Sequence, residues 1–389
     1  MKPRGLSTEL IHRGEDVPVR ADSVGVPIYA TTTFLFDNAD EVRRYQEGKV
    51  DKYLYSRYAN PTVVVTEQKL AALDGAEAAL VFASGMAASS TLMLTFLKPG
   101  DELLCSAAIY GGTFHLVHDV LTALGIAVRF ATLDELQHPA SLVGPKTRLC
   151  WVESPINPTL RCLDVALVAR ACKDAGVLSV LDNTFASPIN QQPLALGVDL
   201  AMQSATKYLN GHSDVTAGVV SGSRALLKKI DLMRRYLGGV LDPTAAFALA
   251  RGLKTLPVRM QRHNATAGQV ARFLAGDRRV TQVFYPGLAS HPDHEIARAQ
   301  MSGFGGMVTF EVPGGLDGAA RVFDRLQVIR RATSLGGVDS LVSLPVLTSH
   351  YNYSDEDLRR AGVTPGMLRV SLGLEDEADL IEDLNQALG

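Results

Sequence analysis

The segment VLSVLDNTFASPINQQPLALGVDLAMQSATK (177–207) contains two short apolar runs, each followed at once by polar residues. The runs VLSVLD (177–182) and DLAMQS (199–204) have the length and apolar content of buried strands. Asp182 closes the first run, and Lys207 follows the second. Ligands of open α/β sheets gather at the carboxyl ends of strands, so this segment predicts a sheet with a site at its edge.

Similar apolar runs lie on both sides of this segment and alternate with helical stretches. Helices are predicted at 62–75, where Gly75 ends TVVVTEQKLAALDG, and at 165–176. This alternation predicts an α/β fold with a mostly parallel sheet that is covered on both faces. The other predicted strands are AALVFA (78–83), DELLCS (101–106), IAVRFA (126–131), TRLCWVE (147–153) and AGVVSG (217–222).

The two ends of the chain have a different texture. Residues 1–60 show little periodicity and suit an arm that wraps a neighbouring subunit. After a long helical region at 223–277, TQVFYPGL and GGMVTFEV are predicted strands of a smaller α+β domain. We therefore predict an N-terminal arm (1–60), a large domain (61–250) and a C-terminal domain (251–389).

Composition excludes several classes of function. The 38 Lys and Arg residues against 41 Asp and Glu give a net charge of −3, which favours neither nucleic acid nor an anionic membrane as partner. The four cysteines form no CxxC pair and no zinc-finger spacing, so we expect buried free thiols and no metal. The N-terminus has no signal-peptide core, and no run reaches about 18 apolar residues. We expect a soluble cytoplasmic protein.

Lys207 is the first candidate for chemistry. A lysine just past a buried strand is partly desolvated, which leaves more of its amine uncharged and nucleophilic toward an aldehyde. Ser204 and Thr206 of SATK are spaced to hold a phosphate. Considered alone the motif is weak, because a lysine after a strand is more often solvated.

Four other positions complement this lysine. Asp182 can pair with a protonated pyridine nitrogen, or simply cap the next turn. Gly85 of SGM (84–86) begins a helical stretch whose N–H groups suit a phosphate, although most such turns only join elements. Tyr110 can stack on a flat cofactor or serve packing. Arg369, in apolar surroundings, can clamp a carboxylate, although most arginines lie at the surface.

Taken together, these segments resemble the Cys/Met-metabolism family of pyridoxal-phosphate (PLP) enzymes. The family includes cystathionine γ-synthase, cystathionine γ- and β-lyases, methionine γ-lyase and O-acetylhomoserine sulfhydrylase. The matching motifs occur in one order along nearly the whole chain: STELIHRG, PIYATTTF, YSRYANPT, FASGMAA, IYGGTF, ESPINPTL, DNTF, QSATKYLNGHSDVTAGV, RGLKTLPVRM, YPGLASHPDHEIA, GFGGM, SLGG and LRVSLGLED.

The resemblance implies an aspartate-aminotransferase-like (type I) fold and a role for each matching residue. Lys207 would hold pyridoxal 5'-phosphate in a Schiff base and later shuttle protons. Asp182 would pair with the pyridine nitrogen, and Tyr110 would stack on the ring and assist proton transfer. The residues that would hold the phosphate are Ser84, Gly85, Met86, Ser204 and Thr206.

The resemblance also implies a shared active site. The family is usually a homotetramer built from two dimers, in which Tyr55 and Arg57 of YSR would reach the phosphate of the neighbouring subunit. Around the substrate carboxylate, Asn157 and Ser334 would join Arg369, with Glu153 as support.

The motif SLGG (334–337) favours the γ-acting branch, because bacterial biosynthetic β-lyases tend to carry tryptophan at the position of Leu335. Cystathionine-handling members often have glutamate before the SLGG serine, whereas Thr333 stands here. Neutral Thr333 suits a substrate with an uncharged far end. Against this, well-known methionine γ-lyases carry cysteine at the position of Gly112. The family's MTH is TSH (348–350) here, so substrate contacts in that loop are not carried over.

The leading hypothesis is therefore α,γ-elimination of L-methionine or a related thioether amino acid to 2-oxobutanoate, ammonia and a thiol. Cystathionine γ-synthase or cystathionine γ-lyase activity is the alternative. Sulfhydrylase or β-elimination activity comes next, and a non-catalytic PLP-fold binding protein is the remote alternative. In each case the expected small-molecule partner is a sulfur amino acid.

Overall fold

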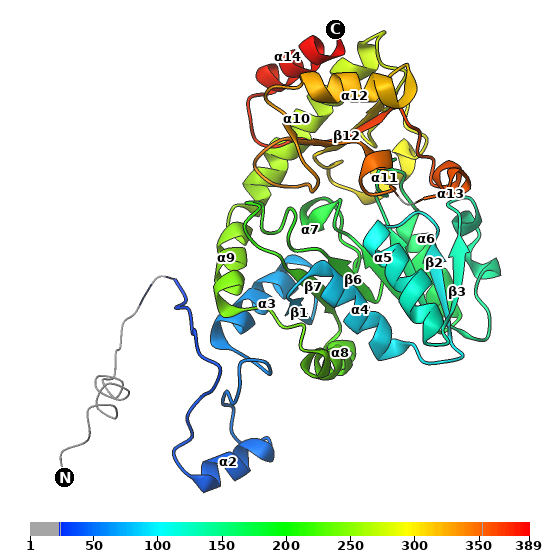
Figure 1. Ribbon diagram of the computed structural model, residues 1–389. Helices are drawn as coiled ribbons and strands as arrows, with labels where there is room; N and C mark the ends of the chain where they lie inside the picture. Colours follow the sequence, from blue (N-terminus) through cyan, green and yellow to red (C-terminus); the bar gives the residue numbers. More distant parts are fainter. Residues whose placement is uncertain (1–22, 24, 352) are drawn as a thin grey trace.

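The computed structural model describes residue 23 and residues 25–351 and 353–389 (Figure 1). The motif STELIHRG (7–14) and the first part of the predicted arm lie outside the described residues. Two sheets organise the body, one of seven strands and one of five. They confirm the predicted α/β architecture, with a mostly parallel sheet and a smaller α+β part.

The seven-stranded sheet has the order β1-β7-β6-β5-β4-β2-β3. Neighbours from β3 to β6 are parallel, whereas β7 runs antiparallel to both β6 and β1. No helix separates β6 from β7, so the chain returns directly as an antiparallel neighbour. Each predicted strand segment contains an observed strand: β1 (Ala78–Phe82), β2 (Glu102–Ser106), β3 (Ala127–Ala131), β4 (Thr147–Glu153), β5 (Leu178–Asp182), β6 (Leu200–Gln203) and β7 (Gly218–Gly222).

Helices cover both faces of this sheet, as the continuous apolar strands predict. One face packs against α4 (Gly85–Phe96), α5 (Gly111–His115), η1 (Leu116–Leu121) and α8 (Arg224–Leu237), around fully buried Trp151. The other face packs against α3 (Pro61–Leu73), α6 (Val165–Asp174) and α9 (Pro243–Leu253). Shorter elements are η2 (Glu135–Gln137), η3 (Pro139–Ser141) and α7 (Ser187–Asn190).

Local capping explains where several helices begin. The side chain of Asn60 accepts a hydrogen bond from the N–H of Thr62 at the start of α3, and Pro61 occupies the first helical position. Ser84 caps α4 through the N–H of Ala87. Gly75, at a φ of 62°, follows α3 in the left-handed conformation that the predicted stop requires.

The five-stranded sheet has the order β10-β11-β12-β9-β8. Side chains alternate across β12, so Leu368 and Val370 enter the hydrophobic core while Arg369, between them, points to the opposite face. The expected boundary at 250/251 falls within α9 and remains a prediction. The elements are β8 (Gln282–Phe284), β9 (Met307–Glu311), β10 (Arg330–Arg331), β11 (Leu341–Ser343), β12 (Met367–Ser371), α10 (Leu256–Gly276), α11 (His294–Gln300), α12 (Gly315–Arg325), η4 (Pro345–Leu347), α13 (Asp355–Arg360) and α14 (Glu377–Leu388).

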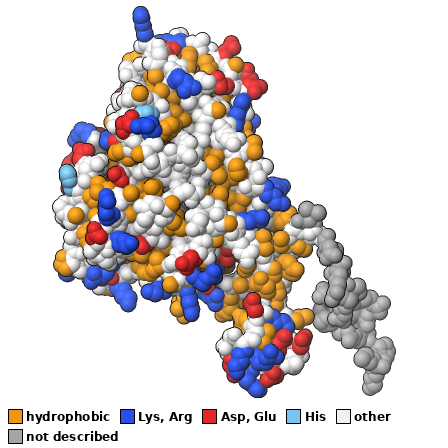
Figure 2. Space-filling model, turned by 180° about the vertical axis from the view of Figure 1, so that it is seen from behind, with side chains coloured by type: hydrophobic (Ala, Val, Ile, Leu, Met, Phe, Trp, Pro, Cys, Tyr) orange, Lys and Arg blue, Asp and Glu red, His pale blue; other side chains and the backbone are white. Residues whose placement is uncertain are grey.

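The described part of the N-terminal arm extends away from the body and carries α2 (Ala39–Gln46) (Figure 1). Several of its hydrophobic side chains are exposed, most of all Leu35 at 89%, and Figure 2 shows hydrophobic atoms over the arm and the adjoining surface. Such a segment buries little of its own apolar surface. In the described part of the chain, no helix combines the length and the apolar character needed to cross a bilayer.

Candidate active site

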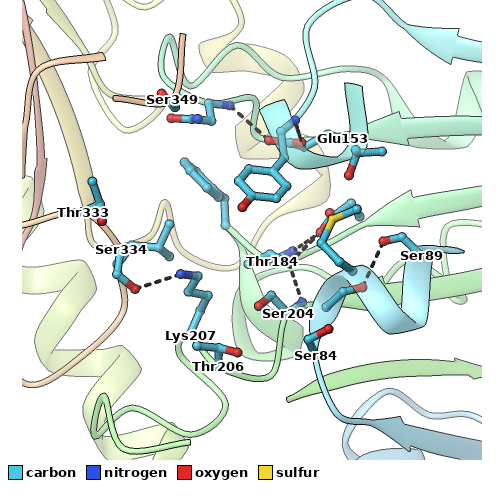
Figure 3. Close-up of a pocket in the computed structure, with 18 of the residues that line it drawn as sticks. Ser84, Ser89, Glu153, Thr184, Ser204, Thr206, Lys207, Thr333, Ser334 and Ser349 are labelled. Carbon is cyan, nitrogen blue, oxygen red and sulfur yellow. Dashed lines mark hydrogen bonds between the residues drawn. The ribbon is translucent and has the colours of Figure 1, made fainter. Parts of the chain in front are cut away.

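A cavity of about 680 Å³ opens at the carboxyl edge of the seven-stranded sheet, between the two sheets. Twelve of the fourteen predicted site residues line it: Ser84, Gly85, Met86, Tyr110, Glu153, Asn157, Asp182, Ser204, Thr206, Lys207, Ser334 and Arg369. Tyr55 and Arg57 are not among the lining residues. Figure 3 shows Ser84, Ser204 and Thr206 toward one end, with Glu153 and Ser349 toward the other.

Lys207 lies on the connection between β6 and β7 and points into the cavity (Figure 3). Its Nζ donates a hydrogen bond to Ser334 Oγ at 2.8 Å. Burial lowers the pKa of Lys207 to about 8, and the nearby Arg369 cation adds to the effect. A larger share of this amine is therefore uncharged near neutral pH than for an exposed lysine.

Asp182 ends β5, beside the end of β6. Both the N–H and the hydroxyl of Thr184 donate to its Oδ1, at 3.1 and 2.6 Å, and the Ser204 N–H donates to the same hydroxyl at 2.8 Å. Burial raises the pKa of the Asp182 carboxyl, and the bonds from Thr184 oppose that shift. The carboxylate is thus held in one orientation at the cavity wall, where it suits a protonated ring nitrogen.

The N-terminus of α4 forms one end of the cavity. A Cβ on Gly85 would lie 3.1 Å from Ser204 Cβ, and one on Gly218 would lie 2.3 Å from Ser84 O. The approach at Gly218 leaves no room for a Cβ, and the tighter-than-usual approach at Gly85 brings the helix N-terminus against the hydroxyl of Ser204. Thr206 completes this end; its hydroxyl donates to Ala217 O and accepts from Ala217 N. Backbone N–H groups and hydroxyls so arranged fit a phosphate.

Arg369, on β12 of the five-stranded sheet, lines the cavity on the side opposite the seven-stranded sheet. Its Nη1 donates to Asn157 Oδ1 at 2.7 Å and its Nη2 to Ser334 O at 3.3 Å. Its Nε is buried and has no hydrogen-bond partner in the described structure. Burial lowers the pKa of Arg369 to about 10, yet the group stays a cation at neutral pH. An unpartnered guanidinium N–H beside a cavity fits a ligand carboxylate.

Glu153 connects two parts of the site. It ends β4, and its two oxygens accept from the N–H of Tyr110 at 2.8 Å and the N–H of Asn157 at 3.2 Å. Burial, with a smaller contribution from the neighbouring Asp182 charge, raises the pKa of Glu153 to about 8. Tyr110 remains half exposed, and a Cβ on Gly112 would come within 2.6 Å of its ring. Gly112 therefore permits the observed position of the ring.

Tyr55 and Arg57 lie outside the cavity of their own chain. Arg57 stacks near the rings of Tyr55 and Tyr58, and its Nη1 donates to Arg235 O at 2.7 Å. The predicted phosphate contact in a neighbouring subunit stays a prediction, since a single chain is described.

Ser334 contacts two parts of the site: its hydroxyl accepts from Lys207 and its carbonyl accepts from Arg369. Its predicted place beside the substrate carboxylate stays a prediction. Thr184, which orients Asp182, is a further residue of the site that the sequence motifs do not indicate. A hydroxyl two residues after the aspartate, as in DNT, is the local signal for such a turn.

The cavity therefore contains groups that match each part of a phosphorylated pyridine aldehyde. The cavity is lined by the amine of Lys207, the buried carboxylate of Asp182 and the N-terminus of α4. Arg369 adds an N–H donor that has no partner in the described structure and could bind a second ligand. This donor set fits pyridoxal phosphate with an amino acid beside it.

The model of one protein family, the Cys/Met metabolism PLP-dependent enzymes, matches residues 7–389. L-methionine γ-lyase of Pseudomonas putida is 42% identical over 386 residues, covering 99% of this chain and 97% of that protein. Cystathionine γ-lyase of Mus musculus is also 42% identical, over 387 residues (98% and 95%). Chloroplastic cystathionine γ-synthase 1 of Nicotiana tabacum is 40% identical over 381 residues (97% and 71%).

Among solved structures, metB from Corynebacterium glutamicum has a TM-score of 0.89 and 39% sequence identity, covering 99% of this chain and 98% of that one. Relatives named for three different reactions thus have nearly equal identity to this chain. The overall likeness therefore does not select the reaction.

Proposed function

This chain belongs to the Cys/Met metabolism family of PLP-dependent enzymes and is a carbon–sulfur lyase or synthase of that kind, and we propose that it is a γ-lyase. The proposed reaction is α,γ-elimination, in which L-methionine or a related thioether amino acid and water give 2-oxobutanoate, ammonia and a thiol.

The observation that carries this choice is the wall formed by 333–335 and 347–349. Its residues that line the cavity are Thr333, Ser334, Leu335, Leu347, Thr348 and Ser349. None of these side chains is ionisable, so this wall offers no carboxylate for a distal ammonium. A neutral thioether end suits such a wall better than the charged end of cystathionine.

Pyridoxal phosphate, when bound, supplies an aldehyde that condenses with amines and a ring that accepts electrons from the substrate's α-carbon. Lys207 is its proposed point of covalent attachment. Ser84, Gly85, Met86, Ser204 and Thr206 would hold the phosphate. Asp182, oriented by Thr184, would keep a proton on the ring nitrogen, and Tyr110 would cover the ring.

Lys207 is also the proposed proton carrier. Its amine, when not bonded to the cofactor, would act as a base toward the α-proton and, after releasing that proton, toward a β-proton. The hydroxyl of Ser334 holds Nζ on the side of the cavity that Arg369 also reaches. The pKa of about 8 supports this role, because the same amine must accept and release protons near neutral pH.

Arg369 and Asn157 would bind the substrate's α-carboxylate. The buried, unpartnered Nε of Arg369 supports this assignment, and the bond from Nη1 to Asn157 orients the guanidinium. Holding the carboxylate would align the α-proton with the amine of Lys207.

We also propose a homotetramer, a dimer of dimers, in which the arm carries Tyr55 and Arg57 to the cavity of a neighbouring subunit. The exposed hydrophobic side chains of the arm support this assembly. The four buried free cysteines are compatible with the proposed reducing, cytoplasmic compartment.

Gly112 supports the second candidate, cystathionine γ-synthase or cystathionine γ-lyase activity, because well-known methionine γ-lyases resembled by this chain carry cysteine at that position. A cysteine Cβ there would lie 2.6 Å from the ring of Tyr110, so the ring could not keep its observed position.

A substrate panel tests the proposal. The purified holoenzyme is incubated with L-methionine, with L-cystathionine, or with O-succinylhomoserine plus cysteine, and the products are identified. We expect 2-oxobutanoate and methanethiol from methionine alone. Absence of both, with cystathionine formed or cleaved in the other reactions, would establish the second candidate instead.

A further inference from the structure

The Arg161–Asp293 ion pair links the loop that follows β4 of the seven-stranded sheet to the segment that precedes α11. Arg161 Nε donates to Asp293 Oδ2 at 2.5 Å and its Nη2 to Oδ1 at 3.1 Å, so the pair is bidentate. Neither residue lines the cavity. Arg161 belongs to the loop between β4 and α6, and Asp293 immediately precedes α11.

Asp293 does not cap α11, although its position just before the helix favours that role. An aspartate just before a helix usually accepts from an N–H of the first turn, but Asp293 makes no such capping bond. Its carboxylate instead turns to the loop, where Oδ2 also accepts from the N–H of Cys162 at 2.9 Å. The Asp293 side chain is 6% exposed and that of Arg161 31%, so the pair is only partly screened by water.

The loop that this pair fixes is the one that carries Asn157. The N–H of Ile156 donates to Arg161 O at 3.0 Å, which closes the loop into a ring with Asn157 inside it. Leu160, in the same ring, has a φ of 55°, a conformation that a leucine keeps only when surrounding contacts impose it. Thr309 of β9 adds one such contact through its hydroxyl bond to Pro158 O.

From these contacts we propose that the Arg161–Asp293 pair is a positioning device for the substrate carboxylate. By fixing the ring at its base, Asp293 holds Asn157 Oδ1 against Arg369 Nη1 and so orients the guanidinium toward the cavity. Asp293 and Arg161 act through Asn157 and touch no substrate themselves. This inference rests on the proposed binding of an amino acid at Arg369.

The decisive variant is Asp293→Asn, which retains an acceptor for the Cys162 N–H but loses the charge that pairs with Arg161. Binding is followed in the holoenzyme by the change in visible absorption on titration with L-norleucine, which has the shape of methionine and no sulfur leaving group. Pentylamine, which is norleucine without its carboxylate, is titrated in parallel. Because pentylamine has no carboxylate, its titration reports only whether an amine can reach the site.

We expect Asp293→Asn to raise the Kd for norleucine about tenfold and to leave that for pentylamine within about twofold. The KM for methionine should rise similarly, and kcat should fall because a less firmly held carboxylate aligns the α-proton less well. Arg161→Lys, which keeps the charge but not the bidentate geometry, should show a smaller loss confined to norleucine. It also serves as the test variant if Asp293→Asn does not fold.

The chain offers a matched control. Asp277 and Arg279 form a bidentate pair with Nη2–Oδ2 at 2.5 Å and side chains 12% and 35% exposed, and neither lines the cavity. Asp277→Asn should leave both titrations unchanged.

Equal losses for norleucine and pentylamine, or no loss for either, would overturn the positioning role while leaving the proposed function intact. A wild-type holoenzyme that responds to pentylamine but to no amino acid would instead overturn carboxylate binding at Arg369, and this inference with it.

Discussion

Lys207 Nζ and Ser334 Oγ are joined by a hydrogen bond of 2.8 Å, although the two residues are 127 positions apart. Ser334 has a φ of 102°, which side-chain-bearing residues rarely adopt. Its carbonyl accepts from Arg369 in the same conformation. One strained residue therefore connects the proposed proton carrier with the proposed carboxylate site.

Two substitutions of Ser334 distinguish the contribution of its hydroxyl from the cost of its backbone conformation. Ser334→Ala should lower kcat for elimination about tenfold, because the amine of Lys207 loses the partner that positions it. Ser334→Gly should lower kcat similarly but have a higher Tm than the alanine variant, since glycine adopts this φ without strain. Steady-state kinetics and thermal melts of both variants provide the comparison. Full kcat in the alanine variant would show that the hydroxyl does not position Lys207.

Thr333 should influence which sulfur amino acid is preferred. We expect Thr333→Glu to shift the ratio of kcat/KM for cystathionine over methionine upward by about tenfold, because a carboxylate there can meet a distal ammonium. Thr333→Gln is the control, because glutamine has nearly the size of glutamate but carries no charge. If the glutamine variant changes the ratio as much as the glutamate variant does, size rather than charge is responsible.

Subunit mixing tests the proposed role of the arm. Arg57→Ala and Lys207→Ala should each be nearly inactive. Random reassociation of equal amounts should restore about a quarter of wild-type activity, because half the dimers are mixed and each contains one intact site. No recovery, with mixed dimers verified by differential tags, would mean that Arg57 serves its own chain.

The lowered pKa of Lys207 predicts how the apoenzyme captures its cofactor. Only the uncharged amine can attack an aldehyde, so the capture rate should rise with pH and level off above the pKa of about 8. Stopped-flow absorbance after mixing apoenzyme with pyridoxal phosphate measures this rate. A midpoint near 10 would indicate a solvated lysine, and Lys207→Ala should show no borohydride-sensitive band at any pH.

Asp74 should limit stability at neutral pH. It is buried beside Gln203, whose Nε2 donates to both carboxylate oxygens, and burial raises its pKa to about 6. Below its ordinary pKa both folded and unfolded states are protonated, so its contribution to stability is lost as pH rises through 6. Asp74→Asn should therefore be about 2 kcal/mol more stable than wild type at pH 8 and nearly equal at pH 4. Thermal melts at the two pH values test this; an equal difference at both would exclude the titration.

Local patterns were sufficient to predict the seven strands of the large sheet and the polar residues at their ends. Apolar runs of four to seven residues and capping residues such as Ser84 act over a few positions, so they can be recognised without the fold. The same logic brought Gly85, Asp182 and Lys207 to one edge. It did not anticipate Thr184, whose role depends on where the Asp182 carboxylate turns.

Long-range partners were beyond such patterns. Arg369 and Asn157 meet across 212 positions, and Arg161 and Asp293 across 132. Asp293 illustrates the reason, because its local context favours a helix cap, and only the packing of the β4–α6 loop against α11 brings Arg161 within bonding distance.

By itself, the sequence determined the α/β class, the gathering of Gly85, Asp182 and Lys207 at one sheet edge, and the family motifs, since each depends on periodicity or on short, ordered segments. Tertiary structure decided that β7 returns antiparallel, that Ser334 faces Lys207, and that Tyr55 and Arg57 lie outside their own cavity. These outcomes depend on which surfaces pack together, and packing is a property of the whole folded chain.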